Sequence, residues 1–193
     1  MALAFTFPGQ GSQAPGMGRD LAAAFPAARE VFQEVDETLK QKLSKIMFEG
    51  QPEELTLTAN AQPALMAMSL AILRVLEKEG GFALRDRVAL VAGHSLGEYA
   101  ALAAAGTFDI ATAARLLRLR GEAMQKATPP GTGAMAALLG AELDQASAIC
   151  AAAATDPETG QKEVVEVAND NGGGQIVISG AVAAVDRAIE KAK

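Results

Sequence analysis

The sequence predicts an α/β fold in two parts, a parallel-sheet domain over residues 1–127 and a small α+β subdomain over residues 128–193. In the first part, the apolar run 88–92 is followed by a glycine-rich turn and an alanine-rich run, which is the order strand, turn, helix. The Pro- and Gly-rich segment 128–133 then predicts a linker, beyond which short strand-like and helix-like patterns alternate.

The composition excludes several classes of protein. The 193-residue chain carries a net charge of −6 and has no basic cluster, which argues against a nucleic-acid partner. One histidine, His94, and one cysteine, Cys150, are too few for a metal site, and the alanine-rich surroundings of Cys150 indicate a core position. The N-terminus lacks the basic region of a signal peptide, and no apolar run reaches membrane-spanning length. We therefore expect a cytoplasmic monomer that does not bind membranes.

The first part begins with an expected strand at 3–7 and continues mainly as helices. Residues 20–35 place apolar side chains at helical spacing, and Pro26 is expected to shift or kink that helix. A second helix-like segment, 39–48, ends at Gly50.

Two further helices are expected on either side of the glycine-rich turn. Thr58 and Asn60 are candidate N-caps of a helix that ends at Gly80-Gly81. From Ala64 to Leu76 this helix is apolar on most sides, as is typical of a helix in the middle of a fold. Asp109 is the expected N-cap of the helix at 110–127.

The turn between the strand 88–92 and the next helix reads Gly93-His94-Ser95-Leu96-Gly97. The run of valine, leucine and alanine before it fits a buried parallel strand, and the alanine-rich run to Ala105 fits a helix. This is the context of a G-x-S-x-G nucleophile elbow, so the first part is predicted to be an α/β-hydrolase-like domain with Ser95 as nucleophile. The alternative is a glycine-rich loop that contains an incidental serine.

A serine nucleophile needs a base, and the sequence offers no obvious one. His94 is adjacent to Ser95, but neighbouring side chains diverge in a tight elbow, so His94 is expected to pack or hydrogen-bond locally. Two alternatives stay open. Either the histidine lies beyond residue 193 and the chain is truncated, which is the favoured interpretation, or Asp170 is the base, as in Ser-Asp dyad hydrolases.

Arg120 is the second informative residue of the first part. Its helical neighbours Leu116, Leu117 and Met124 are core types, and an arginine on an apolar face costs several kcal/mol unless an anion meets it. That anion is either a structural carboxylate or the carboxylate of a substrate, and the residues alone do not decide between them. The other charged residues of this helix fall on a face that is expected to be solvated: Arg115, Arg118, Glu122 and Lys126.

The loop 8–13, Pro-Gly-Gln-Gly-Ser-Gln, superficially resembles a dinucleotide fingerprint, but the third glycine would fall at Ala14. A glycine-rich loop after a strand can also bring backbone N–H groups close to a ligand oxygen, with Gln10 as a side-chain donor or as a support for the loop. A plain tight turn is the other interpretation.

The second part predicts the order β-α-β-β-α, a ferredoxin-like split βαβ unit without its final strand. The missing strand is a second indication that the chain is truncated. The expected elements are a strand at 134–139, a helix at 143–154, a strand at 163–168, a loop at 169–174, a strand at 175–179 and a helix at 182–193.

Several motifs occur in a fixed order along the whole chain. They are Phe7 to Gln13, Gln62-Pro63-Ala64-Leu65, Gly93 to Tyr99, Arg120-Gly121 and Asn169 to Gly180. Together they resemble the malonyl-CoA:acyl carrier protein transacylase family, to which the acyltransferase domains of polyketide and animal-type fatty acid synthases are related.

The resemblance implies a role for each motif. Ser95 would carry malonyl as an ester, the backbone N–H groups of Gln10 and Leu96 would form the oxyanion hole, and Arg120 would bind the free malonyl carboxylate. The remaining implied site residues are Gln62 and His94 in the pocket, and Asn169 and Asn171 in a loop of the small subdomain.

The implied reaction is ping-pong transfer of malonyl from CoA to the phosphopantetheine thiol of acyl carrier protein, in fatty acid biosynthesis, without a bound cofactor. The family's catalytic histidine, in a Pro-Phe-His motif, and a further glutamine have no counterpart in this sequence. We therefore expect this chain alone to be inactive. The alternatives are a Ser-Asp lipid acyl hydrolase and a non-catalytic module that binds a carrier protein.

Overall fold

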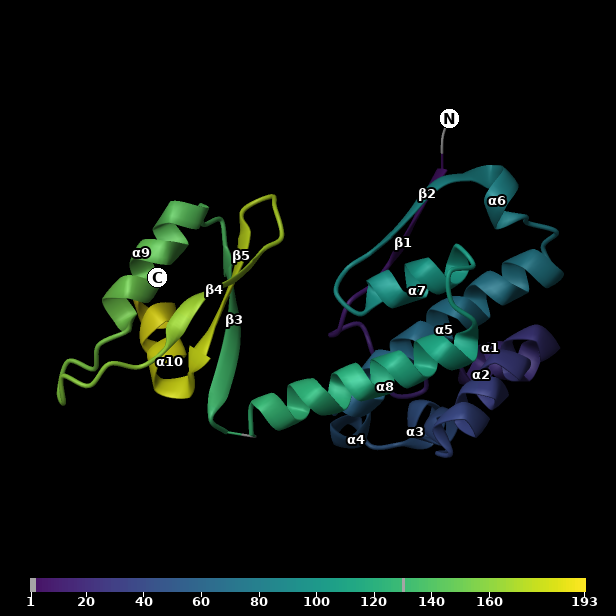
Figure 1. Cartoon of the computed structure of the whole chain (residues 1–193), viewed down its shortest axis with the longest axis horizontal. Coiled ribbons are helices and arrows are strands. Elements are labelled where there is room, and N and C mark those ends of the chain that lie inside the picture. The colour runs from purple at the N-terminus through teal and green to yellow at the C-terminus, as the bar shows by residue number, and fades with distance from the viewer. Residues whose placement is uncertain (1–2, 130) are drawn as a thin grey trace. The chain divides into compact units, whose positions relative to one another are not determined.

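The computed structural model describes residues 3–129 and 131–193. They form two compact units, Met1–Gln125 and Lys126–Lys193, each with its own hydrophobic core. Helix α8 (Ile110–Ala127) runs through this division, which lies two residues before the predicted one (Figure 1). Pro130, in the predicted linker, lies outside the described residues.

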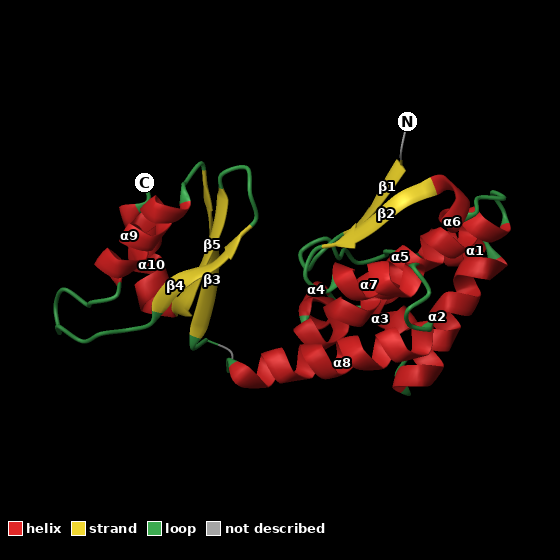
Figure 2. Cartoon of the chain, turned by 45° about the horizontal axis from the view of Figure 1, so that its top comes forward, coloured by secondary structure: helices red, strands yellow, loops and turns green. Residues whose placement is uncertain are grey.

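The first unit contains a parallel pair of strands, β1 (Leu3–Phe7) and β2 (Val88–Gly93). The helices of the unit lie on one side of this pair (Figure 2). The prediction of a parallel strand is confirmed, but the prediction that it is buried is wrong, since Leu90 is 56% exposed. The reason is that no helix of the described residues covers the other face of the pair.

The first unit is otherwise helical. Pro26 divides the expected helix 20–35 in two, because proline fits the first position of a helix better than its interior. The helix expected from 39 begins instead at Leu43, since Lys40 takes a left-handed φ of 50° and ends the preceding helix. Two short helices, α4 and α6, were not predicted. The bounds are α1 Arg19–Ala24, α2 Pro26–Leu39, α3 Leu43–Glu49, α4 Pro52–Thr56, α5 Thr58–Lys78, α6 Leu84–Arg87 and α7 Gly97–Ala104.

Helix α5 is the central helix of the first unit, as predicted from its apolar composition. It is 21 residues long and apolar enough to cross a membrane by length and composition, so the expectation that no segment reaches this length was wrong. Because 61% of the apolar window is buried inside the unit, we interpret α5 as a core helix. Its N-cap is Leu57 and no side chain caps it, so Thr58 and Asn60 are not N-caps.

The second unit is a three-stranded antiparallel sheet with two helices, in the predicted order β-α-β-β-α. Strand β5 lies between β3 and β4 and is antiparallel to both. Strand β4 includes Asn169 and Asp170, although both residues were predicted to lie in a loop. Cys150 is 4% exposed and belongs to the core of this unit, as predicted. The bounds are β3 Gly133–Leu139, α9 Leu143–Ala153, β4 Val165–Asp170, β5 Gln175–Ala181 and α10 Val182–Lys191.

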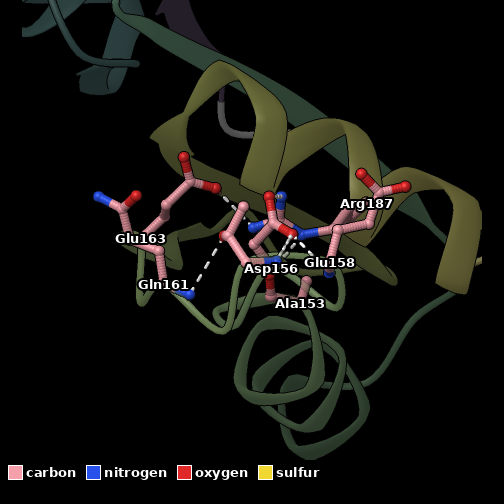
Figure 3. A network of polar contacts seen from close by, with 7 residues as sticks. Ala153, Asp156, Glu158, Gln161, Glu163 and Arg187 are labelled. Atoms are coloured by element: carbon pink, nitrogen blue, oxygen red, sulfur yellow. Dashed lines mark hydrogen bonds and ion pairs between the residues drawn. The ribbon is translucent and has the colours of Figure 1, made fainter.

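A polar network around Arg187 joins α10 to the end of α9 and to the turn that follows it (Figure 3). Arg187 donates to the Ala153 carbonyl at 3.0 Å and pairs with Glu163 at 2.6 Å and with Asp156 at 3.9 Å. Asp156 also accepts backbone N–H groups from Thr159 and Glu158, and these hydrogen bonds hold the pKa of its carboxyl below the usual value.

Candidate active site

Ser95 lies in the sharp turn between β2 and α7, with a φ of 54°. A non-glycine residue seldom adopts this left-handed conformation, and such a residue costs about 1–3 kcal/mol unless its surroundings hold it. The two glycines of the turn allow it, because a Cβ atom on Gly93 would overlap the Gly97 backbone and one on Gly97 would overlap the Phe7 carbonyl. The turn therefore presents the Ser95 side chain to solvent on a strained backbone.

Two further predicted site residues, each from a different helix, meet Ser95 at this turn. Arg120, on α8, donates from Nη2 to Ser95 Oγ at 3.0 Å and from Nη1 to Gln62 Oε1 at 2.8 Å. Gln62, on α5, has no exposed surface, and its Nε2 contacts Met124 Sδ at 3.2 Å. Arg120 thus places a positive charge at the Ser95 hydroxyl, and Gln62 accepts a hydrogen bond from the other terminal nitrogen of the same guanidinium.

Close packing of α8 on the start of α5 brings Arg120 and Gln62 together. A Cβ atom on Gly121 would lie 2.6 Å from the Thr58 carbonyl oxygen and 2.7 Å from Ala59 Cα. Only glycine allows this approach without a shift of one helix. Met124, expected to be a core residue, is 47% exposed because it lies beyond this contact, near the end of α8.

The glycine-rich loop after β1 also borders the turn. Gln10 donates from its side-chain amide to Thr58 Oγ1 at 3.4 Å, which ties the loop to the start of α5. Among the described residues, the backbone N–H groups of Gln10 and Leu96 donate to no backbone acceptor. Leu96 is buried directly before α7, where the helix N-terminus favours negative charge. Their role as an oxyanion hole stays a prediction.

His94 lies against the loop after β1. Its backbone N–H donates to the Phe7 carbonyl at 3.1 Å, and its imidazole Nδ1 lies so close to Gly9 that a Cβ atom there would have to displace it. This agrees with local packing of His94, and its role in the pocket stays a prediction.

Arg118 corrects one prediction. It was assigned to the solvated face of its helix, but it is half-buried and donates from Nη1 to Asn60 Oδ1 at 3.1 Å and from Nη2 to Gln41 Oε1. Burial lowers the pKa of the Arg118 guanidinium, and Glu122 raises it to a lesser extent. Helical spacing alone cannot locate these amide partners, because they come from distant segments.

Three residues of the predicted site belong to the second unit. Asn169 pairs with Val177 of β5, directly after a register shift between Val167 and Asn169. Asn171 donates from its side chain to Gln175 Oε1 at 2.9 Å, and Asp170 Oδ1 accepts the Gly172 N–H at 2.9 Å. Asp170 therefore shapes its own turn, and the roles of all three in a reaction stay predictions.

Comparisons with known proteins agree along the whole chain. Residues 4–193 match the family described as acyl transferase domain. The chain is 49% identical over 191 residues to the malonyl CoA-acyl carrier protein transacylase of Bacillus subtilis and 47% identical over 185 residues to that of Escherichia coli K12. These alignments cover 99% and 96% of the chain, which spans 57% of the length of each relative.

Solved structures give the same result. An acyl-carrier-protein S-malonyltransferase from Bartonella henselae superposes with a TM-score of 0.89 at 56% identity. A malonyl-transacylase in complex with its type II polyketide synthase acyl carrier protein superposes with a TM-score of 0.87 at 43% identity. Both matches cover 100% of this chain and 59% of the solved chain.

Proposed function

The chain belongs to the acyl transferase domain family, and from this we propose that the protein carrying it moves malonyl from CoA to the phosphopantetheine thiol of acyl carrier protein, in fatty acid biosynthesis. One observation carries the proposal: a guanidinium nitrogen of Arg120 lies 3.0 Å from the Oγ atom of Ser95, the candidate nucleophile. A serine hydrolase for neutral esters has no need of a cation at this place.

The proposed reaction has two steps through one covalent intermediate. Ser95 Oγ attacks the thioester carbonyl of malonyl-CoA, the C–S bond breaks, and CoA leaves as the thiol after taking a proton. The thiol of the carrier protein's prosthetic arm then attacks the ester, and Ser95 recovers its proton. We do not assign Arg120 as the base, since a guanidinium stays protonated in proteins.

Arg120 selects the acyl group in this proposal. In the malonyl ester, the free carboxylate lies one methylene group beyond the ester carbonyl, within reach of a guanidinium that already contacts Oγ. Arginine binds a carboxylate through two parallel hydrogen bonds. A guanidinium has five N–H donors. Gln62 accepts from one of them and Ser95 from another, so the remaining N–H groups of Arg120 are available for the carboxylate.

The backbone supplies the second half of the proposed chemistry. The N–H groups of Gln10 and Leu96 would donate to the carbonyl oxygen as negative charge develops on it, a type of contact that typically contributes a 10²–10³-fold effect on rate. Support comes from the lack of other backbone acceptors for both groups in the described residues and from the tie between Gln10 and Thr58.

The finer parts of the assignment rest on the same grounds. We infer that the first unit is an α/β-hydrolase-like domain and that the second is a ferredoxin-like unit, as its strand order β3-β5-β4 suggests. An acyl carrier protein is the proposed partner, since one similar structure is such a complex. A cytoplasmic monomer without bound cofactor remains our expectation, with CoA and phosphopantetheine as substrates.

Intact-mass measurement after mixing with malonyl-CoA tests the proposal. We expect an adduct of about 86 Da, one malonyl group per chain, that is absent in Ser95→Ala. The measurement is made on this chain and on the product of the full reading frame that carries it. No adduct on the product of the full reading frame would overturn the transferase.

Asp170→Asn separates the transferase from the Ser-Asp hydrolase. The hydrolase predicts that this variant loses acyl release, while the 193-residue chain itself is fully active. Under the proposed function, Asp170→Asn changes only the turn that its side chain supports through the Gly172 N–H.

A further inference from the structure

The first turn of α5 forms three hydrogen bonds with two other segments of the first unit, the loop after β1 and helix α8. Gln10 in the loop after β1 donates to Thr58 Oγ1 at 3.4 Å. On α8, Gln125 Oε1 accepts the Ala59 N–H at 3.3 Å, and Arg118 donates to Asn60 Oδ1 at 3.1 Å. The turn that leads to Gln62 is therefore held from outside the helix.

This turn has little support from its own helix. The residue before it, Leu57, provides no side-chain cap. Pro63 lies inside α5 and has no N–H, so the helical hydrogen bond to the Ala59 carbonyl cannot form. A segment without these two supports takes its position from its neighbours.

Arg118 is an unusual neighbour for a merely structural role. Its partners are the neutral amide oxygens of Asn60 and Gln41, and its buried Nε has no hydrogen-bond partner among residues 3–129 and 131–193. Removing a cation from water without a carboxylate partner costs free energy that an apolar side chain would not. Asn60, 5% exposed, is fixed in turn by donation from Nδ2 to the Glu54 carbonyl at 2.9 Å.

The spacing of the two helix-to-helix pairs explains what Arg118 does. Asn60 and Gln62 are two positions apart on α5, and their partners Arg118 and Arg120 are two positions apart on α8. Residues two apart on a helix do not face the same side. The two pairs therefore lie on different sides of the contact at Gly121, and each limits rotation of one helix against the other.

We propose that Asn60 and Arg118 are positioning residues for substrate selection: they fix the start of α5 against α8 so that Gln62 holds Arg120 at the Ser95 hydroxyl. This rests on the proposed function, because it assigns the selected group to the carboxylate that Arg120 would bind. Neither residue touches Ser95 in the structure, so their effect passes through the Gln62–Arg120 pair.

The test uses the product of the full reading frame with Asn60→Ala, Arg118→Met and the double variant. Arg115→Met is the matched control, because Arg115 is an exposed arginine one turn earlier on α8 and contacts Thr112 Oγ1. Two rates are measured: Ser95 acylation against malonyl-CoA concentration, and inactivation by phenylmethylsulfonyl fluoride, a neutral serine reagent that needs no carboxylate site.

We expect KM for malonyl-CoA to rise roughly tenfold in both single variants, with inactivation by the neutral reagent within about twofold of wild type. The double variant is expected to resemble the single variant with the higher KM, because each single variant already removes the hydrogen bond between Asn60 and Arg118. Equal losses in both rates, or KM values equal to that of Arg115→Met, would overturn the proposal. Absence of acylation in the wild type would instead overturn the proposed function.

Gln41→Ala keeps the test decisive if a buried substitution prevents folding. It removes one acceptor of Arg118 and the donation from Gln41 Nε2 to Asn60 Oδ1 at 3.4 Å, and it leaves the hydrogen bond between Arg118 and Asn60 in place. A smaller rise in KM, again without change toward the neutral reagent, supports the positioning role, and an unchanged KM contradicts it.

Discussion

The Nη2 atom of Arg120 lies 3.0 Å from the Oγ atom of Ser95, although Arg120 is on α8 and Ser95 is in the turn after β2, 25 positions earlier. The same guanidinium is held by Gln62, which is wholly buried. The candidate nucleophile and the candidate acyl-selecting group are therefore neighbours within the first unit.

Arg120→Ala is expected to change the choice of acyl group. Hydrogen bonds to a charged group contribute about 1.5–3 kcal/mol each, so the loss of even one such bond should lower Ser95 acylation by malonyl-CoA roughly 10- to 150-fold. Acylation by an uncharged thioester such as acetyl-CoA should be retained or rise. Competition between the two thioesters, read by intact mass with Arg115→Ala as control, measures this ratio. An unchanged ratio would show that Arg120 is structural.

Gly121→Ala is expected to damage the site without weakening the helix. The added Cβ atom would lie 2.6 Å from the Thr58 carbonyl oxygen, so α8 must move away from α5 and carry Arg120 with it. A misplacement of about 1 Å can cost up to 10²-fold in rate. Alanine itself favours a helix by about 1 kcal/mol over glycine. Reduced acylation with retained helical circular dichroism would agree, and wild-type acylation would show that the contact can relax.

Acid is expected to weaken the second unit through Asp156. Hydrogen bonds from Thr159 and Glu158 hold the pKa of its carboxyl below the ordinary 3.8 in the folded state. The carboxylate therefore stabilises the fold above the unfolded pKa, and this contribution is lost as pH falls through the folded pKa. Urea unfolding at neutral pH and at about pH 3 measures the loss, which Asp156→Asn should reduce. An equal loss in both proteins would exclude Asp156 as the cause.

Cys150 is expected to be unreactive in the folded protein. Burial raises the pKa of its thiol, with Glu166 adding to the effect, so little thiolate forms near neutral pH. Its reaction with iodoacetamide should be more than about tenfold slower in buffer than in 8 M urea. Rapid labelling of the native protein would show that the core of the second unit opens easily.

The local parts of this fold were predictable from sequence. Asp109 was expected to cap α8, and its carboxylate accepts the Thr112 N–H at 2.6 Å. The strand, turn and helix around Ser95 follow from hydropathy and two glycines. Capping and sharp turns depend on residues close together in the chain, so a pattern can show them.

Contacts between distant segments were harder to predict from the sequence. Arg120 stood out because its helical neighbours are apolar, yet Arg118 on the same helix was assigned to solvent. The difference lies in Asn60 and Gln41, whose amide oxygens reach Arg118 from other elements. The exposure of β2 was not predicted for a related reason. An apolar run indicates that a strand is suited to burial, but it does not show which element packs against each face of the strand.

The φ of 54° at Ser95 also bears on how the protein would respond to laboratory evolution. Glycine adopts this conformation without strain, whereas alanine keeps the Cβ atom and the strain of serine. A selection for heat resistance alone would therefore favour glycine at position 95, and the population would lose the candidate nucleophile while its melting temperature rose. Libraries built on this scaffold need a screen for acylation at every round.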